Sequence, residues 1–382
     1  MQYREFPSIS GGKVSLLGFG CMRFPTTDPE TSAIDESLST AMIDYAYKHG
    51  VTYFDTAYPY HKGMSETFVG KTLKKYPRDS FRLATKMPLW LLKEKGDAER
   101  ILAEQMERLQ VSFFDFYLLH DMNRENYETA VKFGVIDLLA EYKRKGLIRN
   151  LGFSFHDKVD VLEKHLQVRE WDFVQLQINY LDWEMQDAKR AYELVKEKNI
   201  PVIIMEPVRG GALANLPKRA AELLNKLDPS KSNASWAIRY AASKENALTI
   251  LSGMSSMAQV EDNIETMKEF RPLNEKELNA INQAKSFLLA SGAIPCTGCR
   301  YCMDCPSGVD IPRVFAIYNQ YVMTNNKWSF LNSYQRVLED SKKADKCVAC
   351  GKCARRCPQA IDIPGWMKKI SEAVMEMQKP DK

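Results

Sequence analysis

The distribution of the cysteines restricts the fold of this chain more than any other sequence feature. The chain has 382 residues and nine cysteines, of which only Cys21 lies outside the last third. Cytosolic chains that crowd thiols in this way usually bind metal instead of forming disulfides. The other eight cysteines are all candidate metal ligands: Cys296, Cys299, Cys302, Cys305, Cys347, Cys350, Cys353 and Cys357.

The spacing of these eight cysteines favours iron–sulfur chemistry. The first run is C-x2-C-x2-C-x2-C-P, and the second is C-x2-C-x2-C-x3-C-P, the pattern of bacterial [4Fe–4S] ferredoxins. Three thiolates at every third residue can each bind a different iron of one cube, and the fourth then points toward a second cube. Zinc bound by two separated CxxC pairs and a segment that has lost its metal are the alternatives. The predicted cofactors of the tail are two [4Fe–4S] clusters.

From about Ile294 onward the chain resembles a two-cluster ferredoxin domain. The first run departs from that pattern because two residues, not three, precede its last cysteine. Cys21 lies in an apolar strand pattern, where we expect a buried, unreactive thiol. The resemblance implies that one cluster is bound by Cys296, Cys299, Cys302 and Cys357, and the other by Cys347, Cys350, Cys353 and Cys305.

The first 290 residues alternate short apolar runs, typical of buried parallel strands, with segments of helical periodicity such as 98–110, 188–199 and 235–246. This alternation over about 250 residues predicts an α/β fold, a (β/α)8 TIM barrel. A doubly wound open sheet is the alternative, but no GxGxxG motif follows the first strand. The eight predicted strands are residues 14–20, 52–57, 81–87, 113–120, 148–155, 171–179, 201–207 and 247–253.

We predict two domains, a barrel over residues 1–285 and a small α-rich, ferredoxin-like iron–sulfur domain over 286–382. A polar-faced helix predicted from Asn274 to Leu289 joins them. The net charge of +4, from 53 basic and 49 acidic residues, is too small to indicate a nucleic-acid partner. No apolar run approaches the roughly 18 residues of a membrane span, and the N-terminus lacks the apolar core of a secretory signal. We therefore expect a cytoplasmic protein without a membrane partner.

Polar residues follow three successive predicted strands, where TIM barrels place their chemistry. Asp55 and Tyr60 lie at the end of the second strand, Lys86 ends the third and His120 ends the fourth. A tyrosine hydroxyl can protonate a developing alkoxide, and a nearby ammonium paired to an aspartate would lower the pKa of that tyrosine. A histidine can orient the carbonyl oxygen. These four residue types therefore indicate carbonyl reduction.

The residues that carry this chemistry resemble the aldo/keto reductase signature. It reads FDTAYPY over residues 54–60 and continues to Gly63, Ser65 and Glu66, with Lys86 in ATKMP and His120 in YLLHDMN. Together with the tail, the chain is similar to the iron–sulfur branch of that family. The resemblance implies hydride transfer from NAD(P)H to an aldehyde or ketone, with Tyr60 as the general acid.

The resemblance also implies where the cofactor binds. Ser154 and Gln175 would meet the nicotinamide carboxamide, and Met205 stands where the family has a stacking aromatic. The turn from Gly253 to Asn263, with Ser255, would carry the adenosine end on the N–H groups of a helix start. Departures from the family pattern are Phe155 for its asparagine, His61 for its glycine, and Ser255, Ser256 and Gln259 for its phosphate-binding cations.

Two redox systems in one chain leave three interpretations open. In the first, the barrel is a nicotinamide-dependent reductase of a small carbonyl substrate. In the second, the barrel binds FMN, with Arg209, Gly210 and Gly211 or the Gly253 turn as phosphate sites. The clusters then relay single electrons from a ferredoxin or flavodoxin. In the third, the chain is an electron-transfer module and its barrel site is vestigial.

Overall fold

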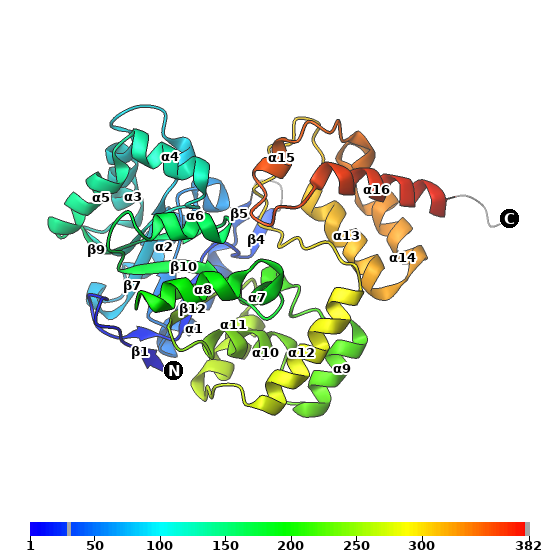
Figure 1. The fold of residues 1–382 in the computed structure, drawn as a ribbon, viewed down its shortest axis with the longest axis horizontal. Coiled ribbons are helices and arrows are strands. Elements are labelled where there is room, and N and C mark those ends of the chain that lie inside the picture. Colours follow the sequence, from blue (N-terminus) through cyan, green and yellow to red (C-terminus); the bar gives the residue numbers. More distant parts are fainter. Residues whose placement is uncertain (29–31, 379–382) are drawn as a thin grey trace. The chain divides into compact units, whose positions relative to one another are not determined.

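The computed structural model describes residues 1–28 and 32–378, and a closed parallel barrel forms the core of the first part of the chain (Figure 1). The strand order is β10-β11-β12-β3-β6-β7-β8-β9. The predicted strands are confirmed, and the open-sheet alternative is wrong because Ile250 of the last strand pairs with Leu17 of the first. The barrel strands are β3 (Leu17–Gly20), β6 (Tyr53–Asp55), β7 (Arg82–Met87), β8 (Phe114–Leu119), β9 (Ile148–Phe155), β10 (Phe173–Gln177), β11 (Val202–Met205) and β12 (Ala247–Gly253).

Helices surround this barrel and cover it with one apolar face each. In α3 the buried positions Ala98, Ile101, Leu102, Gln105 and Leu109 recur every three or four residues, as a helix lying on a sheet requires. The three helices predicted from periodicity are α3, α8 and α10. The helices are α1 (Glu36–Lys48), α2 (Ser65–Leu73), α3 (Asp97–Leu109), α4 (Arg124–Lys132), α5 (Val135–Arg144), α6 (Val159–His165), α7 (Asp182–Met185), α8 (Ala188–Glu197), α10 (Asn233–Ala242) and α11 (Met257–Lys268).

Aromatic rings fill the barrel interior. The Phe116 ring meets Tyr53 at 5.0 Å and Phe173 at 5.1 Å, both in edge-to-face geometry. Phe6 and Ile9 pack against this interior cluster from a loop between two short antiparallel strands, β1 (Tyr3–Arg4) and β2 (Val14–Ser15). The barrel is therefore a packed core, and chemistry must take place at its ends.

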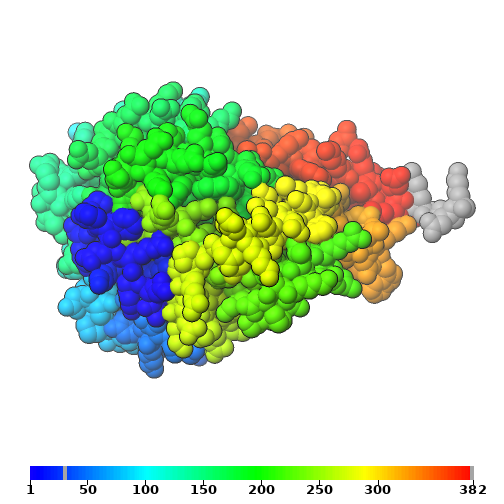
Figure 2. Space-filling model, turned by 60° about the horizontal axis from the view of Figure 1, so that its bottom comes forward, coloured from blue at the N-terminus to red at the C-terminus, as the bar shows by residue number. Residues whose placement is uncertain are grey.

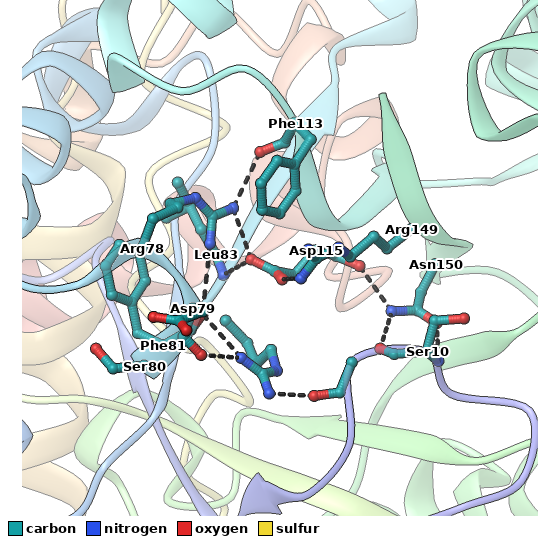
Figure 3. A network of polar contacts seen from close by, with 12 residues as sticks. Ser10, Arg78, Asp79, Ser80, Phe81, Leu83, Phe113, Asp115, Arg149 and Asn150 are labelled. Carbon is teal, nitrogen blue, oxygen red and sulfur yellow. Dashed lines mark hydrogen bonds and ion pairs between the residues drawn. The ribbon is translucent and has the colours of Figure 1, made fainter. Parts of the chain in front are cut away.

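A buried ion network closes the N-terminal end of the barrel (Figure 3). The carboxylate of Asp115 on β8 lies 2.7 Å from Arg78 and 2.9 Å from Arg149, and it accepts a 3.0 Å bond from the N–H of Leu83. Asn150 donates to the carbonyls of Ser10 and Asp115. Because Asp115 is fully buried, removal of either arginine would leave charge poorly compensated. This end is built for stability.

The chain packs as two compact units that interleave along the sequence. One contains residues 1–208 and 234–274, and the other contains 209–233 and 275–382. In the second unit α9 and α12 lie side by side (Figures 1 and 2). The helix predicted over 274–289 is α12, and the predicted boundary after residue 285 falls inside it. The helices of the second unit are α9 (Lys218–Leu227), α12 (Glu275–Ala290), α13 (Ile311–Thr324), α14 (Lys327–Asn332), α15 (Lys352–Arg355) and α16 (Ile363–Met377).

Each cysteine run in the second unit leads into a helix that begins in the same way. Both runs are followed by an aliphatic-Asp-Ile-Pro sequence. Asp310 caps α13 by accepting from the N–H of Arg313, and Asp362 caps α16 by accepting from the N–H of Gly365. Each helix also has a proline near its start. Proline has no backbone N–H, and the first N–H groups of a helix have no partner within the helix, so nothing is lost there. Within residues 1–28 and 32–378, none of the helices has the length and apolar character needed to cross a membrane.

Candidate functional site

A buried ion pair lies at the C-terminal end of the barrel. Lys86 on β7 donates to Asp55 Oδ1 at 2.6 Å and to the carbonyl of Thr56 at 2.7 Å. Lys86 is fully buried and Asp55 is 3% exposed. Neighbouring parallel strands end at the same edge of the barrel, so the two residues meet although 31 positions separate them. An isolated buried ammonium would be costly, and the carboxylate and carbonyl compensate its charge.

Tyr60 and His120 lie against this ion pair. The Lys86 Nζ is 4.9 Å from the centroid of the Tyr60 ring, which stands edge-to-face to the His120 ring at 6.0 Å. The structure thus brings together the four residues predicted from the strand ends. His61 follows Tyr60 with a left-handed φ of 50°. This is a conformation that glycine adopts easily and that strains a histidine.

The protonation of these groups follows from burial. Burial raises the pKa of Asp55 although Lys86 opposes the shift, and it lowers the pKa of His120 well below its usual range, with Lys86 adding to the effect. Burial also raises the pKa of Tyr60 well above its ordinary value, assisted by Asp55 and Glu206. The expectation that a nearby ammonium lowers the pKa of Tyr60 is wrong for this structure, because burial dominates. Tyr60 holds its proton at neutral pH.

A polar network behind β7 fixes the backbone that carries Lys86. The side-chain amide of Gln105 on α3 donates to the carbonyl of Lys86 at 3.0 Å and to Glu66 at 2.7 Å. Its oxygen accepts from the hydroxyl of Tyr117 at 2.6 Å. Thr85 also donates to Glu66. All these side chains are fully buried, so the network leaves the strand little freedom at Lys86.

The predicted nicotinamide residues lie on β9 and β10, the two strands that follow β8 around the barrel. Ser154, the last residue but one of β9, pairs in register with Gln175 of β10. Ser154 Oγ accepts from the N–H of Asp121 at 2.9 Å. Gln175 Nε2 contacts Met205 Sδ at 3.3 Å, whereas Gln175 Oε1 is a buried acceptor with no partner in the described part of the chain. A carboxamide N–H would satisfy that oxygen, so these residues fit a nicotinamide.

The turn after β12 already uses part of its anion-binding capacity internally. The N–H of Ser255 donates to Gln259 Oε1 at 2.7 Å, and Ser256 Oγ caps α11. Asn263 is buried and donates to Ser252 Oγ at 2.9 Å. A phosphate at this turn would have to replace such bonds or use other donors.

Arg23, which was not among the predicted site residues, supplies a cation beside this turn. A Cβ on Gly253 would lie 3.1 Å from Arg23 Cδ, so the arginine stem crosses that glycine. The Arg23 guanidinium reaches Glu206 at 3.5 Å, and Ser255 Oγ donates to the Arg23 carbonyl at 2.7 Å. Its position in the sequence could have identified it. Arg23 follows the first barrel strand by three residues, at the end of the barrel where the other site residues lie.

Two aromatic residues beside His120 were also missed. The Trp90 ring lies 4.9 Å from the His120 ring and is 42% exposed. Burial lowers the pKa of His156 to about 4, and this residue contributes to the low pKa of His120. Both follow barrel strands directly or closely, so the same positional rule would have included them.

The turn at Arg209, proposed for a flavin phosphate, belongs to the second unit. Arg209 is 2% exposed and has a left-handed φ of 51°. Gly210 packs so closely against the carbonyl of Thr297 that a Cβ there would collide with it. The backbone of the first cysteine run therefore occupies this side of the turn, and it does not offer an open cradle for FMN.

The cysteines fall into two groups that mix the two runs. Burial raises the pKa of Cys302, and the nearby thiols that add to the shift are Cys299, Cys296 and Cys357. The N–H of Gly298 donates to Cys296 Sγ at 3.4 Å. This is the set expected for the first cluster, with its fourth thiol from the second run.

The second group surrounds a cavity. Cys305 of the first run lines it together with Cys347, Cys350 and Cys353 of the second run. Burial raises the pKa of Cys353, and Cys347 and Cys305 add to the shift. Among the described residues no three His, Cys, Asp or Glu side chains lie close enough to bind one metal ion. Thiolates spread around a cavity fit a cube with a ligand on each iron.

Cys21 is fully buried, and burial raises the pKa of its thiol, as expected for an unreactive cysteine.

Asp121, directly after His120, is held in an unusual state. Its φ is 54°, and its Oδ2 accepts from Asn123 at 3.2 Å. Its Oδ1 is buried and has no partner in the described residues. Burial, with Asp157 nearby, raises the pKa of Asp121 to about 7.

We therefore expect Asp121→Asn to raise the free energy of unfolding by about 1–3 kcal/mol above pH 7 and to change it little below about pH 4. The folded-state pKa lies above the unfolded value, so stability present below about pH 4 is lost as the pH rises through about 7. Urea unfolding at pH 4 and pH 8 measures the difference. Exposed Asp137→Asn is the control, and an equal gain from Asp121→Asn at both pH values would contradict the assignment.

Comparison with known proteins assigns this barrel and its cysteine-rich tail to known families. The model of the aldo/keto reductase family matches residues 16–286, about the whole barrel. The chain belongs to the aldo/keto reductase family. A 4Fe–4S dicluster domain matches residues 295–361, which contain all eight clustered cysteines. The chain is thus an aldo/keto reductase-family oxidoreductase with a C-terminal 4Fe–4S domain.

Individual aldo/keto reductases support the same assignment. L-galactose dehydrogenase of Arabidopsis thaliana is 26% identical over 285 residues, covering 69% of this chain and 88% of its own. The NADH-specific methylglyoxal reductase of Escherichia coli is 24% identical, with 66% and 89% covered. The holo form of an aldo-keto reductase from Bacillus halodurans superposes with a TM-score of 0.62 at 26% identity, covering 74% of this chain and 96% of that one.

Proposed function

We propose that this protein reduces a small aldehyde or ketone to an alcohol with NAD(P)H, with Tyr60 as the general acid, and that its tail holds two [4Fe–4S] clusters. The observation that carries the reduction is the buried Lys86–Asp55 pair at 2.6 Å beneath the Tyr60 ring, with His120 at its edge. Relatives named as a galactose dehydrogenase and a methylglyoxal reductase support a carbonyl or alcohol substrate.

The site residues act on the carbonyl oxygen. Tyr60 donates its proton to that oxygen as the carbon–oxygen double bond becomes a single bond, and its raised pKa ensures that it carries the proton at neutral pH. His120 is neutral because burial lowers its pKa, so it can orient the oxygen by donating one N–H without adding a second cation beside Lys86. Asp55 holds Lys86 in place.

The hydride comes from the nicotinamide when it is bound. Gln175 would hold the carboxamide through its unpartnered Oε1, and Ser154 has a hydroxyl proton left to donate, since its oxygen only accepts from Asp121. Met205, whose sulfur lies 3.3 Å from Gln175 Nε2, would offer the ring an apolar contact. Arg23 supplies positive charge near the Gly253 turn, where the sequence lacks the usual cations.

The two cysteine groups support the proposal of two clusters. Each group joins three thiols of one run to the last thiol of the other run. Crossed ligation of this kind requires both runs to fold together, and the two capped helices that follow the runs provide that framework.

The test uses protein purified without oxygen. We expect about eight irons per chain and oxidation of NADH or NADPH that depends on an added aldehyde or ketone and yields the matching alcohol. A protein that forms alcohol only with reduced methyl viologen, and never with NAD(P)H, would overturn the nicotinamide assignment. Acid-released flavin would instead support the FMN alternative.

A further inference from the structure

The two cysteine groups differ in their access to the surface. Around the first group, Thr297 is only 3% exposed, and it packs against Gly210. Around the second, Cys350 is exposed and the neighbouring Val348 is 68% exposed. A cluster bound by the second group would therefore lie just beneath the molecular surface, next to an apolar side chain.

Exposed bases also lie beside the second group, whereas Arg300, the base within the first run, lies 4.0 Å from Asp310. Between residues 345 and 356 the exposed charged side chains are one acid, Asp345, and four bases. Asp345 pairs with Lys346 at 2.7 Å, and Arg356 pairs with Asp304 of the first run. Within the described residues no ion pair engages the remaining two bases, Lys352 and Arg355, which bound the single-turn helix α15.

These exposed cations can do more than neutralise the charge of the cluster. A [4Fe–4S] cube with four thiolates carries about −2 in its oxidised state by formal charge, and it repels an acidic protein. Exposed lysine and arginine side chains offset that repulsion at the surface and attract negative charge over about a Debye length, ~8–10 Å. Val348 supplies the apolar centre that a small transient interface needs.

We propose that this surface, the basic rim formed by Lys346, Val348, Cys350, Lys352 and Arg355, is the docking site of a small acidic protein that carries single electrons. In each encounter the reduced carrier loses one electron and the oxidised second cluster gains it, with no bond made and no proton moved. The inference rests on the cluster content proposed above. It assigns electron entry to the second cluster, not the first.

The test is the rate at which reduced flavodoxin, an acidic one-electron carrier, reduces the clusters of the anaerobic protein in a stopped-flow instrument. We expect Lys352→Glu/Arg355→Glu to slow this bimolecular step by about 10–100-fold at low salt, because charge steering is lost. The milder Lys352→Gln/Arg355→Gln should give an intermediate loss. The difference from wild type should shrink as salt is added.

The matched control is Lys226→Glu/Lys276→Glu, which makes the same change in net charge at exposed positions of α9 and α12. We expect the control to stay within about twofold of wild type. Iron content and reduction by dithionite, a small reductant, must be unchanged in all variants. Intact clusters with equal rates in both double variants would overturn the docking site alone. Wild-type protein without a second cluster would overturn the proposed cofactors and the docking site together.

Discussion

Tyr60→Phe should reduce kcat for carbonyl reduction by about 10²–10⁴-fold with little change in the KM for NAD(P)H. The substitution removes the proton that the proposed mechanism transfers to the carbonyl oxygen. The ring remains, so its contacts with Lys86 and His120 are kept. Steady-state kinetics with one aldehyde at saturating cofactor measures the loss.

The control for this variant is two residues away. Tyr58→Phe deletes a hydroxyl that donates to Glu104 at 2.7 Å, away from the ion pair. It tests the same chemical change in the same segment, and we expect turnover within about threefold of wild type. Tyr60→Phe protein that turns over like Tyr58→Phe protein would show that Tyr60 is not the acid.

Removal of a single crossed cysteine should eliminate the cluster of the other run. We expect Cys357→Ala to lose about four of about eight irons and to leave the same electron paramagnetic resonance signal as Cys296→Ala. Cys305→Ala should instead match Cys347→Ala. The reason is that Cys357 groups with Cys302, whereas Cys305 lines the cavity of the second run.

Cys21→Ala serves as the control for these losses. Cys21 is buried in the other compact unit, and its loss should leave the iron content unchanged. Cys357→Ala protein with the spectrum of Cys347→Ala protein would show that each run binds its own cluster. Protein that holds zinc in place of iron after anaerobic purification would contradict the cluster assignment as a whole.

The barrel could be predicted because its signals are local. Parallel strands buried on both faces are continuous apolar runs, such as Val202–Met205, and each run ends at a polar residue or a turn. The cysteine runs are local as well, since their spacing alone favours cubes. The division into compact units could not be predicted, because it depends on the packing of α9 against α12. Neither helix carries a sequence motif, and neither stands out in composition from the rest of the chain.

The site was predictable in its residues but not in its electrostatics. The four polar residues at strand ends meet because parallel strands share an edge, a consequence of topology. The direction of the Tyr60 pKa depends on how deeply Asp55, Lys86 and the ring are buried, which no spacing reveals. Arg23 escaped notice because its relevance arises from the close approach of its stem to Gly253, across the pairing of β12 with β3.

The most direct test of direct hydride transfer follows the hydrogen itself. NAD(P)H carrying deuterium at the transferred position of C4 is oxidised by the anaerobic protein with an aldehyde, and the alcohol is analysed by mass spectrometry. The proposed function predicts one deuterium on the carbon that was the carbonyl carbon, and about 10²–10⁴-fold less of this deuterated alcohol from Tyr60→Phe in the same time. Alcohol without deuterium from the wild-type protein would contradict direct hydride transfer.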